Sequence, residues 1–153
     1  MLPSGLKFLK IIKYGDYSLD NLPNSLIKLY CDNNDIISLD NLPSTLEDLD
    51  CNVNYLTSLD NLPNSLTHLT LYYKFSQPID YLPYGIKKIN FGTGFNQPID
   101  NLPESIEYLT FKGSFNQPID NLPSSVIFLS LGYSFEQSID LIPNGIKFLE
   151  IGY

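Results

Sequence analysis

Apolar side chains recur along this chain with a period of 20 residues. A proline marks the same place in each period, and these prolines are Pro3, Pro23, Pro43, Pro63, Pro83, Pro103, Pro123 and Pro143. Apolar residues stand three, six and eight positions after each proline. Self-similarity at a fixed period is typical of repeat architectures, in which each unit buries its apolar face against its neighbours. The pattern therefore predicts eight stacked copies of one unit, forming a single domain over residues 1–153.

The sixth and eighth positions after each proline predict one short strand per repeat, the first at about residues 8–11. Because side chains alternate across a strand, these two positions share a buried face and the fifth and seventh face outward. Pro78, Pro98 and Pro118 interrupt the second half of their repeats and disfavour a helix there. We expect a solenoid with one parallel sheet and an extended, helix-poor back, right-handed as parallel crossovers generally are.

Residues 26–36 and 46–56 both match the pattern L-x-x-L-x-C-x-x-N-x-[IL]. This pattern resembles the signature of the leucine-rich repeat family. The resemblance implies a leucine-rich-repeat solenoid in which Asn34 and Asn54 turn inward and hydrogen-bond the neighbouring backbone as an asparagine ladder.

A different pattern begins in the fourth repeat, where phenylalanine occupies the twelfth position after the proline. These residues are Phe75, Phe95, Phe115 and Phe135. We predict that they form a second aromatic column, packed beside Phe91 and Phe111. The position that follows holds Asn96 and Asn116 in the fifth and sixth repeats, and we assign these asparagines to a structural ladder.

The segment FGTGFNQPIDNLP at residues 91–103 resembles the FNIP (FGxxFN) class of leucine-rich repeats. Proteins of this class occur in social amoebae and in giant viruses of protists, where such repeats are often joined to an F-box. The resemblance is close in the fifth and sixth repeats and looser in the fourth and seventh. It implies a protein-interaction module, and by analogy the recognition part of a host-directed adaptor.

An aspartate column runs through the chain at Asp20, Asp40, Asp60, Asp80, Asp100, Asp120 and Asp140. Stacked carboxylates could hold calcium, but the glycine-rich nonapeptide of calcium-binding solenoids is missing. We expect these carboxylates instead to accept local backbone hydrogen bonds that fix a turn.

The charge balance disfavours two classes of partner. Nine lysines and no arginine stand against 17 acidic residues, which gives a formal charge of −8. Nucleic-acid binding requires a basic stripe, and anionic membrane surfaces attract basic segments, so we expect neither partner. The chain has no apolar run of membrane-spanning length, no secretory signal and no N-x-[ST] site. We expect an intracellular location, which would be the host cytoplasm if the protein is viral.

Candidate catalytic groups are few. Cys31 and Cys51 occupy the inward eighth position, where thiols stay protonated, and no disulfide is expected in a reducing compartment. His68 occupies the outward fifth position and cannot reach them. We find no set of metal ligands, no phosphate-binding loop and no nucleophile elbow. The sequence predicts a non-catalytic protein without a cofactor.

Aromatic residues gather on the outward face of the last strands. Tyr108, Phe128 and Phe148 occupy the fifth position of adjacent repeats, and Ile127 lies beside them. A contiguous apolar patch of this kind is typical of a protein-binding surface. We predict that it binds a protein partner, with Tyr72, Tyr73 and Tyr133 extending the surface along one rim.

Two alternatives remain. Neither end of the chain carries a recognisable polar cap, so the C-terminal edge or the aromatic patch could join copies of the chain into a homo-oligomer. Alternatively, the aromatic residues could bind a glycan together with Asp48, Asp50 and Asn90.

Overall fold

The structure is a computed structural model that describes residues 2–12, 19–32, 36–52 and 55–152. The described residues form one sheet in which the strands follow sequence order. The strands are β1 (Phe8–Ile11), β2 (Lys28–Asp32), β3 (Asp48–Asn52), β4 (His68–Leu71), β5 (Lys88–Phe91), β6 (Tyr108–Phe111), β7 (Phe128–Leu131) and β8 (Phe148–Ile151). Every neighbouring pair is parallel. No helix occurs in the part of the chain that the structure describes, so the predicted solenoid is confirmed.

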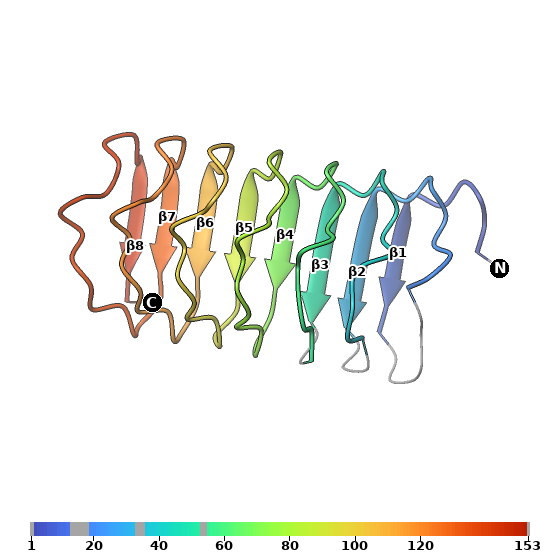
Figure 1. Ribbon diagram of the computed structural model, residues 1–153, viewed down its shortest axis with the longest axis horizontal. Coiled ribbons are helices and arrows are strands. Elements are labelled where there is room, and N and C mark those ends of the chain that lie inside the picture. Colours follow the sequence, from blue (N-terminus) through green and yellow to red (C-terminus); the bar gives the residue numbers. More distant parts are fainter. Residues whose placement is uncertain (1, 13–18, 33–35, 53–54, 153) are drawn as a thin grey trace.

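Extended return segments connect the strands (Figure 1). In Figure 1 the strands point downward behind these segments and the repeats advance from right to left, which is the right-handed sense. The register advances by one full repeat from strand to strand, so that Leu49 pairs with Leu69. Because parallel strands lie about 4.8 Å apart, equivalent positions of neighbouring repeats touch. Each apolar position thus becomes a continuous column along the solenoid.

The columns make the core that the periodicity predicts. The sixth position is fully buried from β2 to β7, at Leu29, Leu49, Leu69, Ile89, Leu109 and Leu129. Burial alternates along these strands, with the fifth and seventh positions more exposed than their neighbours in β2 to β6. Successive side chains along a strand therefore point alternately into the core and onto the open face of the sheet.

The predicted aromatic column is confirmed. Successive rings from Phe75 to Phe135 stack with centroids 6.2 Å apart at each step. The rings of Phe91 and Phe111 stack against this column. The centroid of Phe91 lies 4.0 Å from that of Phe95, and the centroid of Phe111 lies 3.8 Å from that of Phe115. The two phenylalanine columns therefore interleave into one aromatic core in the C-terminal half.

The asparagine ladder is seen in the same half. The side-chain Oδ1 of Asn96 accepts a hydrogen bond from the backbone amide of Asn116 at 2.8 Å, and Oδ1 of Asn116 accepts one from the amide of Glu136 at 2.9 Å. Asn96 is exposed and Asn116 is half-buried, so this ladder lies at the rim and not in the core. Asn34 and Asn54, the first predicted members, lie outside the described residues.

The aspartate column requires a correction. Four of its carboxylates accept hydrogen bonds that join repeats, and Asp140 accepts a local one from the Ser138 hydroxyl at 2.9 Å. Oδ1 of Asp20, Asp40, Asp80 and Asp100 accepts from the side-chain amide of Asn41, Asn61, Asn101 and Asn121, at 2.5–3.0 Å. The local backbone bond runs the other way, because the backbone amides of Asp40, Asp60 and Asp140 donate to the serine hydroxyl two residues earlier. At these four aspartates a neutral amide is placed beside the carboxylate.

A hydroxyl column, which the sequence reasoning missed, ties the repeats together beside the strands. It consists of Ser25, Thr45, Ser65, Ser105 and Ser125, and each hydroxyl donates to a backbone carbonyl of the preceding repeat at 2.6–2.8 Å. These bonds satisfy carbonyls where the chain enters the sheet.

Backbones approach closely at the turns after β5, β6 and β7. A methyl group built on Gly92 would lie 2.4 Å from the backbone nitrogen of Tyr73, and one built on Gly132 would lie 2.4 Å from that of Gly113. Gly113 itself has φ of +68°, which L-residues with a side chain rarely adopt. These glycines allow consecutive turns to nest.

Candidate interaction surface

The open face of the sheet is formed by the first and third residues of each strand, and its N-terminal half is polar. Lys28 Nζ lies 2.6 Å from Asp48 Oδ2, and the ammonium of Lys10 lies 4.7 Å from the centroid of the Tyr30 ring. The bond from the amide of Asn90 to the Thr70 hydroxyl, at 3.0 Å, continues this pattern. These contacts join neighbouring strands, and they engage Asp48 and Asn90, polar groups that the glycan alternative requires.

Asp50 is poorly satisfied on this face. Its Oδ1 atom is buried and has no hydrogen-bond partner within the described part of the chain, while Oδ2 lies 3.5 Å from the Tyr72 hydroxyl. Burial raises the pKa of Asp50 above its ordinary value of 3.8, and the nearby carboxylate of Asp48 raises it further. The ionised form is therefore disfavoured in the folded protein.

Asp50→Asn is expected to stabilise the fold at neutral pH. Because the folded-state pKa of Asp50 is raised, the folded protein holds this proton to higher pH than the unfolded chain. The free energy of unfolding of the wild type should decrease as pH rises from about 3.8 through the folded-state pKa of Asp50. The variant should not show this decrease. The gain should be less than about 1 kcal/mol, since water still screens the carboxylate.

Urea denaturation at several pH values measures this effect. Asp32→Asn is the matched control, because the Asp32 carboxylate accepts a hydrogen bond from the Asn52 side-chain amide at 2.8 Å and its loss should bring no gain. Parallel pH profiles for wild type and Asp50→Asn would contradict the assignment.

The C-terminal half of the open face carries the predicted aromatic patch. The rings of Phe128 and Phe148 stack 4.6 Å apart at an interplanar angle of 4°, and Tyr108 lies 6.0 Å from Phe128. Tyr108 and Phe148 keep 41% and 48% of their surface exposed, while Phe128, between them, is half-buried, as is Ile127. The parallel register aligns the three rings because each is the first residue of its strand.

The tyrosines predicted to extend this patch lie past the ends of their strands, where a rim was expected. Tyr73 and Tyr133 are exposed two residues beyond β4 and β7, whereas the patch residues stand first in their strands. Tyr133 lies five residues after Phe128, in the turn that follows β7. Tyr72 is half-buried and leans toward Asp50. That these tyrosines extend the binding surface stays a prediction.

The two cysteines face the core. Cys31 and Cys51 are fully buried and free, with their Sγ atoms 2.9 Å apart, and burial raises the pKa of Cys51 well above its ordinary value. His68 is exposed on the opposite face, where its Nδ1 lies 2.8 Å from the hydroxyl of Thr67. Thiols in this state are poor nucleophiles.

Neither a metal site nor a membrane span is found. Among the described residues, no three His, Cys, Asp or Glu side chains converge to hold a metal ion. Over the same residues, no helix is long and apolar enough to cross a membrane.

Two exposed tyrosines on the return side escaped the sequence reasoning. Tyr81 and Tyr84 have 72% and 89% of their surface exposed. In four other repeats the position of Tyr81 is occupied by an asparagine, namely Asn41, Asn61, Asn101 or Asn121. This exception to the repeat was the signal that could have identified it.

The comparisons with known proteins agree with this geometry. The family model described as FNIP Repeat matches residues 55–94, 75–114, 95–134 and 115–153. The crystal structure described as CroV588, a novel circular LRR protein, covers 99% of this chain with 31% sequence identity and a TM-score of 0.76. YopM from Yersinia enterocolitica WA-314 also covers 99% of the chain, with 23% identity and a TM-score of 0.54. This chain spans 28% and 43% of the lengths of those two proteins. No curated protein matches it.

Proposed function

Because this chain belongs to the FNIP repeat family, a class of leucine-rich-repeat proteins, we propose that it is a non-catalytic protein-interaction module that binds through the open face of its sheet. Solenoids of this kind commonly act as interaction scaffolds, since stacking repeats creates an extended surface whose outward residues vary freely. In its finer form, the proposal makes the chain the recognition part of a host-directed adaptor.

The observation that carries the proposal is the aromatic stack of Tyr108, Phe128 and Phe148. Three rings on adjacent strands form a contiguous apolar surface, whereas isolated aromatic residues would not form one. Two contacts hold this surface in place: the half-buried Phe128 packs between its neighbours, and the Ser130 hydroxyl donates to Glu150 Oε2 at 2.8 Å. A rigid aromatic cluster loses little conformational entropy on binding, which is why such clusters serve as anchors in interfaces.

Phe128→Glu is expected to abolish capture of the partner. Inserting a carboxylate in the centre of the stack should weaken binding by about 2 kcal/mol or more, the size typical of an interface anchor. The measurement is affinity capture from a protist lysate, with wild type and variant immobilised side by side and the bound proteins identified by mass spectrometry. Tyr55→Glu, which places the same charge on an exposed residue outside the sheet, is the matched control. Equal recovery by wild type and Phe128→Glu would show that another surface binds.

Self-association is the second candidate, because the ring stack reaches the last strand, β8, through Phe148. Copies of the chain could then join through the aromatic patch or the β8 edge. Light scattering of wild type and Phe148→Lys separates the two functions. A molar mass that falls to the monomer value only in the variant would favour the assembly, and a monomer in both cases would favour a different protein as partner.

A further inference from the structure

A groove of about 530 Å³ lies on the return side of the solenoid, across three successive turns at residues 60–64, 80–84 and 101–104. The tyrosines Tyr81 and Tyr84 contribute two aromatic rings to its lining, and Asp60, Asp80 and Glu104 contribute three carboxylates. No lysine or histidine is among the residues that line it. The groove is therefore both aromatic and acidic.

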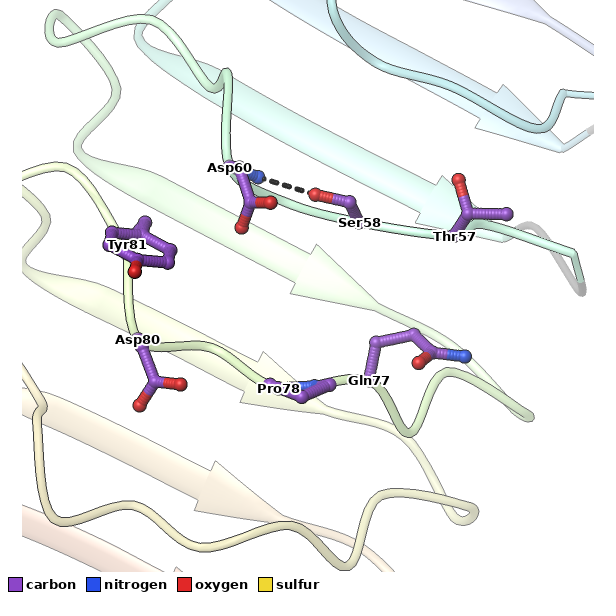
Figure 2. A pocket seen from close by; sticks show the side chains of 7 residues that line it. All are labelled: Thr57, Ser58, Asp60, Gln77, Pro78, Asp80 and Tyr81. Atoms are coloured by element: carbon purple, nitrogen blue, oxygen red, sulfur yellow. Dashed lines mark hydrogen bonds between the residues drawn. The ribbon is translucent and has the colours of Figure 1, made fainter.

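Tyr81 creates part of this groove by interrupting the Asp–Asn column. In the neighbouring repeats the amide that follows the aspartate donates to the aspartate of the preceding repeat, as Asn61 does to Asp40 and Asn101 does to Asp80. Tyr81 makes no such bond, and the Asp60 carboxylate has no hydrogen-bond partner within the described ranges. Figure 2 shows Asp60, Asp80 and Tyr81 around one adjoining hollow, in which the backbone amide of Asp60 donates to the Ser58 hydroxyl.

This combination selects a cationic ligand. Aromatic faces attract an ammonium or guanidinium group through their quadrupole, and carboxylates attract it through their charge. A neutral ligand would contact the rings but gain no attraction from the three carboxylates, and the carboxylates would repel an anion. Leu82 and Pro83 between the tyrosines supply apolar surface for the methylene stem of a long side chain. The protein's net charge of −8 would also speed the approach of a basic partner.

We propose that the groove binds lysine or arginine side chains presented by an extended basic segment of a partner protein. Its volume lies within the range of specific ligand sites, and its length of three stacked turns, about 10 Å between the outer two at the sheet spacing, suits an extended segment better than a single small cation. The site is independent of the open sheet face, because it is built from return segments and turns.

The test replaces both rings by the residues that the preceding repeat carries. Tyr81→Asn combined with Tyr84→Asn leaves the charge unchanged, matches Asn61 and Asn64 of the preceding repeat, and should restore the bond to Asp60. Binding of a fluorescein-labelled peptide of alternating glycine and arginine to the full chain is followed by fluorescence anisotropy. The double variant should bind roughly tenfold more weakly, a factor of about three for each ring. Unchanged affinity would overturn the proposal.

A second pair of variants covers the case in which the double variant is unstable. Asp60→Asn and Asp120→Asn remove the same charge, but only Asp60 lines the groove. Asp60→Asn should weaken peptide binding by several-fold and Asp120→Asn should leave it nearly unchanged. Equal losses would mean diffuse attraction by the acidic surface and would overturn the site. A glycan array bound by wild type but not by the tyrosine variant would overturn the choice of ligand, while Phe128→Glu should leave peptide binding unaffected.

Discussion

Replacing Phe95 with alanine is expected to lower the free energy of unfolding by about 3–5 kcal/mol, the cost of removing a fully buried aromatic side chain from a core that cannot close around the gap. Phe95 is 0% exposed and stacks on four other rings. These are Phe75 at 6.2 Å, Phe91 at 4.0 Å, Phe111 at 6.0 Å and Phe115 at 6.2 Å. The loss should be at the upper end of the range because both interleaved columns lose a neighbour.

Urea denaturation followed by circular dichroism measures this loss, and Phe8→Ala is the matched control. Phe8 is 51% exposed at the other end of the sheet, so its removal should cost less than about 1 kcal/mol. In a solenoid, cooperativity depends on contacts between adjacent repeats. We therefore also expect Phe95→Ala to broaden the transition, as the repeats on its two sides become less tightly coupled. Similar losses for the two alanine variants would contradict an aromatic core.

Gly132→Ala is expected to destabilise the protein by about 3 kcal/mol or more, since overpacking against backbone cannot be relieved by a rotamer change. The added methyl carbon would lie 2.4 Å from the backbone nitrogen of Gly113 and 3.0 Å from the carbonyl carbon of Lys112. Moving the turns apart would strain the bond from the Ser134 amide to the Gly113 carbonyl, which is 3.2 Å long. One methyl group should therefore disturb two repeats.

Gly85→Ala provides the comparison for Gly132→Ala. A methyl group there would lie 3.5 Å from the nearest atom, the carbonyl oxygen of Asn64, which is an ordinary contact. Since alanine restricts the unfolded chain more than glycine does, the change should be neutral or stabilise by up to about 1 kcal/mol. Thermal unfolding of both variants measures the difference, and equal melting temperatures would show that the turns do not nest as described.

The fold could be predicted because one unit is repeated with a constant period. Leu29 and Leu49 occupy the same position of consecutive repeats, 20 residues apart. A strand pattern found in one repeat therefore predicted the register of the whole sheet. The aromatic column was predictable for the same reason, since Phe75, Phe95, Phe115 and Phe135 stand at one position of successive repeats. Burial of the cysteines and exposure of His68 followed from alternation alone.

Bonds between side chains of adjacent repeats were harder to predict. The partner of Asp40 is Asn61, 21 residues later, and only the geometry of the turn decides between this amide and the local backbone. The spacing between Tyr133 and the aromatic patch likewise depends on the length of β7, since Phe128 begins this strand and Tyr133 lies in the turn that follows it. The groove was invisible because it results from an exception to the pattern, Tyr81, whose neighbours come from other repeats.

The constant register also bears on how such a chain can change in length. Because every column continues from one repeat to the next with the same spacing, a whole unit such as residues 95–114 could be duplicated or deleted without creating a new kind of packing contact. Gene duplication would then lengthen the array in steps of about 4.8 Å and bring with each step a fresh set of outward residues. The core would stay the same while the outward residues changed, so new surfaces could arise without a new core having to evolve.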